Sequence, residues 1–222
     1  MGRIDQGTDG ETKSSTLRQI FFSPYSALTI TMFCWAATTV IVRYVREDIP
    51  PMGLSFWRNV IAFLMLLPFA IKPLCKHWAD VCRHWKIFSL LSLLLWVGGN
   101  ALLFLSLQYT IAINAAVINS IEPLLIVLFA WLLFRDHFSV GQGIGLLISL
   151  GGVIVLIAAG SLERLLNLDF NQGDLIVTGA YISWSLYAVI LRKAPSNVDH
   201  RAIAVVILGL GALFLAPIYF LE

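Results

Sequence analysis

The sequence predicts an all-α, polytopic transmembrane helix bundle with seven spans. Of its 222 residues, 59% are hydrophobic and only 13% are charged, whereas a soluble domain carries about 25% charged residues. Apolar runs recur along the whole chain, and each is close to the roughly 20 residues that cross ~30 Å of hydrocarbon as a helix. Because the connectors are short, neighbouring helices should pack antiparallel. The predicted spans are 26–42, 53–71, 87–107, 113–134, 140–159, 174–191 and 202–221.

Residues 1–25 are polar and mixed in charge, so we interpret them as a tail ahead of the first span and not as a signal peptide. Lysine and arginine are enriched in cytoplasmic loops, which sets the orientation. With the N-terminus in the cytoplasm, three basic residues fall outside: Arg43, Arg46 and Arg164. Eleven fall inside: Arg3, Lys13, Arg18, Lys72, Lys76, Arg83, Lys86, Arg135, Arg192, Lys193 and Arg201. The sequence therefore predicts a cytoplasmic N-terminus.

The basic loop 72–86 contains a short repeat, Cys75-Lys76-His77-Trp78 and Cys82-Arg83-His84-Trp85. One interpretation is a Cys2His2 metal site, but this spacing is not that of a usual zinc site. The alternative is an interfacial helix with tryptophans at the lipid headgroups and basic groups in water. We favour the interfacial helix, and we expect no disulfide framework, no metal and no cofactor.

Residues 114–157 form a predicted membrane hairpin around the polar break 135–139. Ser139-x-x-Gln142 fits a capping box, which would begin the second helix of the hairpin. Gly141, Gly145 and Ser149 give that helix a face of small residues. Such faces allow close helix packing, so we expect this helix to pack tightly on the span before it or on the third span.

A longer internal repeat relates the first and sixth spans. Trp35 and Arg43 are eight residues apart, as are Trp184 and Arg192, and a shift of 149 residues aligns the two pairs. The first span runs outward and the sixth inward, so the second repeat would be inverted, as in many secondary transporters. We predict a five-span first repeat over 26–160 and the first two spans of a second over 173–222.

These pieces together resemble the EamA family of the drug/metabolite transporter superfamily. The resemblance rests on Asn114-Ala-Ala, on Glu122-Pro123, on the acidic turn with its glycine-rich helix, and on Gly173-Asp174 followed by Trp184 and Tyr187. The turn residue is usually Glu in that family and is Asp136 here, so its contacts should differ. The resemblance implies ten spans, of which this chain would lack the last three. The DNA beyond codon 222 would test that expectation.

Four polar side chains from three predicted spans fall at one depth. At 1.5 Å per residue, Arg58 lies roughly 7 Å, Asn100 roughly 10 Å, Asn119 roughly 9 Å and Glu122 roughly 13 Å below the outer boundary. On the same scale, four aromatic residues fall at about 10–16 Å: Trp35, Trp96, Tyr181 and Trp184.

A charge at the bilayer centre costs about 2.5–3.5 kcal/mol on insertion scales, so Arg58 and Glu122 should not both face lipid. One interpretation is a buried ion pair that fixes two helices. The other is a polar pocket for substrate or gating, formed by Arg58, Asn100, Asn119 and Glu122. In that pocket, Trp35, Trp184 and Tyr181 would form aromatic walls. Pro123 frees a backbone carbonyl near Asn119, adding another candidate ligand.

We interpret the chain as a secondary transporter or exporter of small metabolites that works by alternating access, and not as an enzyme. The alternatives are a membrane enzyme acting on lipid-linked substrates and a non-transporting membrane fragment or scaffold. The sequence has no His-Glu-x-x-His, no Gly-x-Ser-x-Gly and no ATP-binding loop. The expected partners are membrane lipid, a small-molecule substrate, and protons or a counter-substrate, with a homodimer left open and no nucleic acid. The expected location is the bacterial inner membrane.

Overall fold

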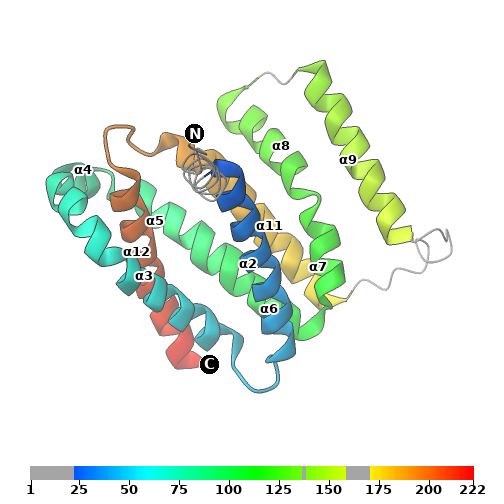
Figure 1. Ribbon diagram of the computed structural model, residues 1–222, viewed down its shortest axis with the longest axis horizontal. Helices are drawn as coiled ribbons and strands as arrows, with labels where there is room; N and C mark the ends of the chain where they lie inside the picture. Colours follow the sequence, from blue (N-terminus) through cyan, green and yellow to red (C-terminus); the bar gives the residue numbers. More distant parts are fainter. Residues whose placement is uncertain (1–22, 137–138, 159–170) are drawn as a thin grey trace, which may run out of the picture. The chain divides into compact units, whose positions relative to one another are not determined.

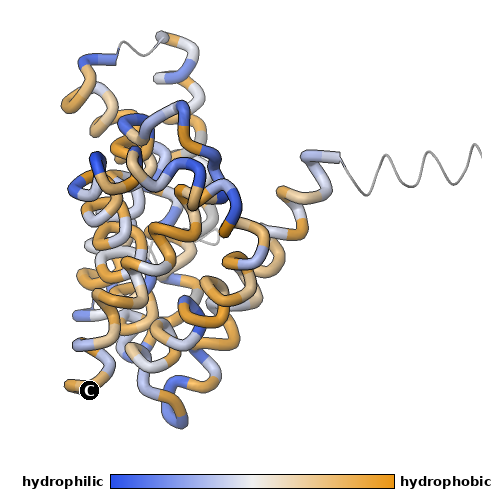
Figure 2. The backbone as a smooth tube through the Cα atoms, turned by 90° about the vertical axis from the view of Figure 1, so that its left-hand side faces the viewer, coloured by the Kyte–Doolittle hydropathy of each residue, from blue (hydrophilic) through white to orange (hydrophobic). Residues whose placement is uncertain are grey.

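The structure, a computed structural model, describes residues 23–136, 139–158 and 171–222, and each regular element in them is a helix. Most of the predicted tail, His137, and the outer Arg164 lie outside these ranges. The chain divides into two compact units, Met1–Ile41 and Val42–Glu222. Figure 1 shows the helices along the chain, and in Figure 2 hydrophobic residues run along the helices while hydrophilic residues gather mainly in the turns.

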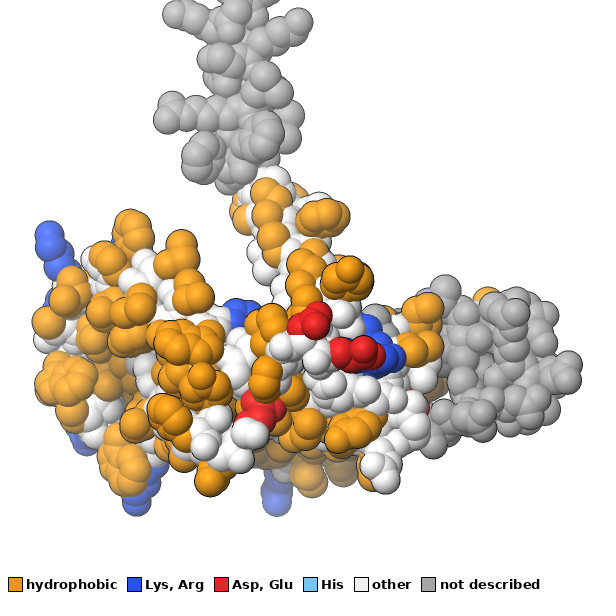
Figure 3. Space-filling model, turned by 90° about the horizontal axis from the view of Figure 1, so that it is seen from below, with side chains coloured by type: hydrophobic (Ala, Val, Ile, Leu, Met, Phe, Trp, Pro, Cys, Tyr) orange, Lys and Arg blue, Asp and Glu red, His pale blue; other side chains and the backbone are white. Residues whose placement is uncertain are grey.

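Six helical stretches are long and apolar enough to cross a membrane, and they confirm six of the predicted spans. They are Pro24–Tyr44, Pro51–Lys76, Trp85–Tyr109, Ile113–Phe134, Gln172–Lys193 and His200–Leu221. The remaining apolar run forms helix α9 (Val140–Ala158). Hydrophobic side chains also dominate the surface seen in Figure 3, as expected of helices that face lipid. The chain is therefore a multi-pass membrane protein.

The first unit contains most of α2 (Pro24–Tyr44). Its threonines hydrogen-bond to carbonyls four residues earlier: Thr29 to Tyr25 and Thr31 to Ala27. This bond satisfies a hydroxyl inside an apolar helix without a partner from another element. Threonines in this helix are therefore compatible with a membrane span.

In the second unit, α3 (Pro51–Lys76) packs along α12 (His200–Leu221). The short α4 (Trp78–Arg83) leads into α5 (Trp85–Ser92), which continues as the π-helix η1 (Leu93–Ala101) and then as α6 (Leu102–Tyr109). A buried hydrophobic core joins α4, α5, η1 and α12, and Phe88, Leu91 and Leu215 are fully buried in it. The basic loop predicted over 72–86 is therefore largely helical.

Helix α11 (Gln172–Ile190) packs against η1 and α6, and also against the two parts of the fourth span, α7 (Ala112–Asn119) and α8 (Glu122–Phe134). It ends in the short 3-10 helix η2 (Leu191–Lys193). Two glycines of η1 permit the close approach: a Cβ at Gly98 would overlap Ser183, and one at Gly99 would overlap the Trp184 indole. Helix α11 therefore packs against both the third and the fourth spans.

The helix starts of α9 and α11 have side-chain caps. The backbone N–H of Ser139 donates to Gln142 Oε1 (2.8 Å), and the N–H of Gln142 donates to Ser139 Oγ (3.2 Å), which confirms the predicted capping box. Asn171 and Asp174 form the same reciprocal pair at α11. Helix α9 thus begins where the sequence predicts, and α11 begins two residues before the predicted start at 174.

The predicted tight packing of α9 through its small residues is wrong for Gly141 and Gly145. A Cβ at Gly145 would meet no atom within 4 Å, and one at Gly141 would meet only Ser139 Oγ at 3.8 Å. The side chain of Ser149 lies outside the described set. A stripe of small residues permits close packing but does not supply a partner, and here the stripe has none among the described residues.

Candidate functional site

Arg58 on α3 is held by an amide and two aromatic rings. Its Nη2 donates a hydrogen bond to Asn100 Oδ1. The guanidinium carbon lies 4.6 Å from the Phe104 ring centroid and 5.7 Å from that of Trp96, both within cation–π range. Its Nε is buried without a hydrogen-bond partner. The cation is thus partly desolvated while one donor remains free.

Asn100 reaches Arg58 from the π-helical turn. Its Nδ2 donates to the carbonyl of Leu95, five residues earlier, at 2.7 Å. The Asn100 side chain therefore bonds both to the backbone of η1 and to the Arg58 guanidinium on α3. A π-helical segment widens the helix by one residue per turn and is frequent at functional sites. The sequence predicted Asn100 at this depth, but hydropathy does not register the change from α to π.

The ion pair between Arg58 and Glu122, one of the two interpretations of their similar depth, is not formed. The ion pairs of the described residues are Arg46–Glu47, His77–Asp80 and Arg192–Asp136. The two charges belong to different helix contacts: α3 packs on α12, η1 and α6, whereas α8 packs on α11. Arg58 and Glu122 therefore have a similar predicted depth in the membrane but lie in different helix contacts.

The fourth span is broken where Glu122 and Asn119 lie. Helix α7 ends at Asn119 and α8 begins at Glu122, with Pro123 in its first turn. Between them, the N–H groups of Ser120 and Ile121 bond to carbonyls three residues back, both at 3.0 Å. Asn119 Oδ1 is buried without a hydrogen-bond partner. The break is one tight turn, since Ser120 and Ile121 keep right-handed helical dihedrals within the membrane-long stretch Ile113–Phe134.

Helix α11 presents its aromatic face to this break. The ring centroids of Tyr181 and Trp184 are 5.4 Å apart. The Ser185 hydroxyl donates to the Tyr181 carbonyl at 2.8 Å and approaches the Glu122 backbone carbonyl at 3.5 Å. Glu122, Tyr181 and Ser185 therefore form one contact between α8 and α11. Sequence reasoning missed Ser185, whose only signal is its spacing of four from Tyr181.

The predicted site residues thus fall into two groups in the second unit. Arg58 and Asn100 lie in one, and Asn119, Glu122 and Tyr181 in the other; Trp184 joins them because its indole packs on Gly99 of η1, next to Asn100. Trp35 belongs to the first unit, so its role in the site stays a prediction. Phe104, which contacts Arg58, gave no signal in the sequence.

A cavity of about 540 Å³ opens beside the first group, between η1, the end of α11 and α12. Trp96 and Tyr187 line its deep part, and Ser196 and His200 line it near the connecting loop. Trp96 also contacts Arg58, and its Nε1 is buried without a hydrogen-bond partner. Trp96 therefore lies between this cavity and Arg58.

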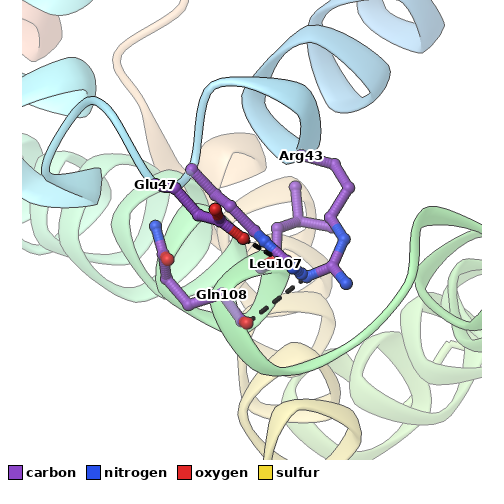
Figure 4. Close-up of polar contacts among 5 residues, drawn as sticks. Arg43, Glu47, Leu107 and Gln108 are labelled. Atoms are coloured by element: carbon purple, nitrogen blue, oxygen red, sulfur yellow. Dashed lines mark hydrogen bonds and ion pairs between the residues drawn. The ribbon is translucent and has the colours of Figure 1, made fainter.

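Arginines fix the ends of two helices. Arg43, in the last turn of α2, donates through Nη1 to the carbonyls of Leu107 (2.5 Å) and Gln108 (3.3 Å) near the end of α6 (Figure 4). Arg192 after α11 pairs with Asp136 (2.5 Å) and lies 5.0 Å from the Phe134 ring. Asp136 of the acidic turn therefore contacts Arg192, whereas Arg43 binds backbone carbonyls near the end of α6.

Membrane-long helices, one broken span and unpaired polar atoms at membrane depth are features of multi-pass membrane transport proteins. The chain belongs to the EamA-like transporter family, which it matches over residues 23–158.

Several curated relatives are similar to the chain. It is 28% identical over 157 residues to an uncharacterized transporter, YyaM, of Bacillus subtilis, covering 71% of the chain and 52% of the relative. It is 26% identical over 192 residues to an uncharacterized transporter of Archaeoglobus fulgidus, covering 86% and 64%. It is 26% identical over 193 residues to the uncharacterized inner membrane transporter YedA of Escherichia coli, covering 86% and 60%. The chain thus spans between half and two thirds of these relatives, and no solved structure gives a significant match.

Proposed function

We propose that this protein is a secondary transporter of small metabolites that works by alternating access, with substrate contacts at the break in the fourth span. The break between Asn119 and Glu122 carries the proposal. Discontinuous membrane helices expose backbone groups and helix ends at mid-depth, and transporters use such places for substrates and coupling ions. The break faces α11, the first helix of the predicted second repeat, and binding near the midplane at a repeat interface is typical of these folds.

The polar atoms around this place suit a mobile ligand. Buried polar groups nearly always have hydrogen-bond partners, yet Asn119 Oδ1, Arg58 Nε and Trp96 Nε1 have none among the described residues. A substrate in the 540 Å³ cavity would meet Trp96, which lines it, and substrate contacts of Asn119 and Arg58 would form beyond the cavity lining. Arg58 would bind or gate the substrate on one side, and Glu122 with Tyr181 on the other. Glu122 would also be the group through which protons couple to transport.

The location belongs to the same proposal. We place the protein in a bacterial inner membrane with its N-terminus in the cytoplasm. The eleven-to-three distribution of basic residues supports the orientation, and YedA is named as an inner membrane transporter. In this orientation the cavity beside Trp96 opens toward the cytoplasm.

The test is an untargeted comparison of metabolites. Cells that express the natural gene, or its Arg58→Gln or Glu122→Gln variant, are grown alike, and the metabolites in their media are compared by mass spectrometry. Metabolites whose export needs the wild-type protein are candidate substrates. Each is then measured for flux in proteoliposomes with and without an imposed pH gradient.

We expect both variants to reach the membrane in wild-type amounts and to abolish the flux. A matched control is Thr178→Val, since that hydroxyl bonds only to a carbonyl of its own helix, the Asp174 carbonyl at 2.8 Å. Wild-type flux in both charge variants would show that Arg58 and Glu122 are structural. The absence of any metabolite dependent on the protein would contradict the transport function itself.

A further inference from the structure

A second cavity, of about 370 Å³, is unrelated to the polar groups described above. It lies between α3, α4, α5 and α12, where two membrane-long helices reach the basic segment 72–86. Its lining is almost entirely apolar and includes Phe63, Trp78, Cys82, Trp85, Phe88 and Val206. An apolar groove that is open at the membrane boundary is suited to a hydrocarbon chain and not to a hydrated metabolite.

The Cys-Lys/Arg-His-Trp repeat builds the rim of this groove. Both tryptophans line it and stay more than half exposed, Trp78 at 57% and Trp85 at 59%. Cys82 of the second copy lines it, whereas Cys75 of the first copy is exposed elsewhere. Tryptophan is enriched at the level of lipid headgroups because one part of the indole is apolar and the other is polar.

Basic residues adjoin the lining residues along the chain, with Arg83 directly after Cys82 and Lys86 directly after Trp85. Lys76, Arg83 and Lys86 are exposed, and the Lys86 ammonium lies 6.0 Å from the centroid of the Trp85 ring. The nearby acid, Asp80, is already engaged: Asn197 donates to its Oδ2 at 3.0 Å, and His77 lies 3.9 Å away. The groove thus combines an apolar channel with a basic rim, which matches the two ends of an acidic phospholipid.

We propose that this groove binds one anionic glycerophospholipid, with an acyl chain along Phe63 and Phe88 and the phosphate on Arg83 and Lys86. Trp78 and Trp85 then flank the glycerol region. A neutral phospholipid has the same chains but places a choline or ethanolamine cation against the basic rim. The site therefore selects lipids by net headgroup charge.

The two cysteines give a matched pair of probes. The full chain is reconstituted in nanodiscs of phosphatidylcholine, or of phosphatidylcholine mixed with phosphatidylglycerol. Alkylation of each cysteine by N-ethylmaleimide, a neutral reagent, is followed over time by peptide mass spectrometry. We expect Cys82 to react several-fold more slowly when phosphatidylglycerol is present, and Cys75 to react at the same rate in both membranes.

The Arg83→Gln/Lys86→Gln double variant should weaken the preference for phosphatidylglycerol by roughly thirtyfold, since the two basic groups near the surface contribute separately to anionic lipid binding. Glycerol phosphate added in solution should not protect Cys82, because it has no chain to fill the groove. Equal Cys82 rates in both membranes, protection that persists in the double variant, or equal slowing of both cysteines would each overturn the proposal.

Discussion

At the residue scale, Asp174 shows how this bundle accommodates a buried carboxylate. It is 3% exposed and accepts hydrogen bonds from Thr110 Oγ1 (2.5 Å), Asn114 Nδ2 (3.4 Å) and the Asn171 backbone N–H (3.1 Å). These donors come from both sides of the turn before α7 and from the start of α11. The carboxylate thus caps α11 and fastens it to the end of the third span and the start of the fourth.

Thr110→Val should lower stability because it removes one of those donors while Asp174 stays buried. The expected loss in the free energy of unfolding is about 1–3 kcal/mol, the cost of an unsatisfied buried polar group. Thermal unfolding of the purified protein in detergent measures it. Thr178→Val is the matched control and should change stability by less than ~0.5 kcal/mol, since it removes no tertiary contact. Equal unfolding temperatures of the two variants would contradict this account of Asp174.

Predicted depth in the membrane is a limited guide to which side chains are in contact. Counting 1.5 Å per residue placed Arg58, Asn100 and Glu122 in one slab, and the structure joins Arg58 to Asn100 but not to Glu122. Depth fixes a position along the membrane normal but not the direction in which a side chain leaves its helix. The partner of Arg58 is fixed by the π-turn of η1, which hydropathy does not detect.

At the scale of elements, the contact between η1 and α11 depends on glycine. Gly99→Ala would place a methyl group inside the Trp184 indole, so η1 and α11 must separate. Overpacking of this kind costs about 1–3 kcal/mol. Because Trp184 lies between the two polar groups of the site, transport should fall together with stability. Unfolding temperature and flux measured on one preparation would check both.

Gly145→Ala on α9 is the matched control for that substitution. Its Cβ would meet no atom within 4 Å, so only helix propensity changes, by up to about 1 kcal/mol in favour of alanine. A large loss of stability in this variant would show that the glycine face of α9 is packed after all, as the sequence first suggested. A Gly99→Ala variant as stable as wild type would contradict the close contact with Trp184.

The helices themselves were largely predictable, since length, hydropathy and capping residues act locally. Ser139 and Gln142 bond as the sequence predicts, and the six membrane-long stretches are those of the apolar runs. The irregularities were not: the break at Ser120 and Ile121 and the π-turn around Asn100 are changes of backbone hydrogen bonding within one span, which hydropathy does not detect. Both irregular places carry the candidate site.

At the scale of the whole molecule, charge distribution and topology must agree. The basic residues near α4 and after α11 lie on the side assigned to the cytoplasm, and the loop between α2 and α3, with Glu47 and Asp48, lies on the other. Acidic side chains are visible on the face shown in Figure 3, and Glu47 beside Arg43 in Figure 4 belongs to that loop. Successive spans should then cross in opposite directions, because each begins on the side of the membrane where the preceding one ends.

The proposed cytoplasmic location of the N-terminus predicts opposite labelling of two loops. In intact cells, a membrane-impermeant maleimide should leave Cys75 and Cys82 unmodified and should label a cysteine placed at Asp48 in the outer loop. After the membrane is permeabilised, Cys75 should react rapidly, because its side chain is exposed in the folded protein. The Asp48→Cys variant controls for reagent activity and for delivery to the membrane. Rapid labelling of Cys75 in intact cells, with Asp48→Cys protected, would reverse the orientation, so the cavity beside Trp96 and the proposed lipid groove would both face the other leaflet.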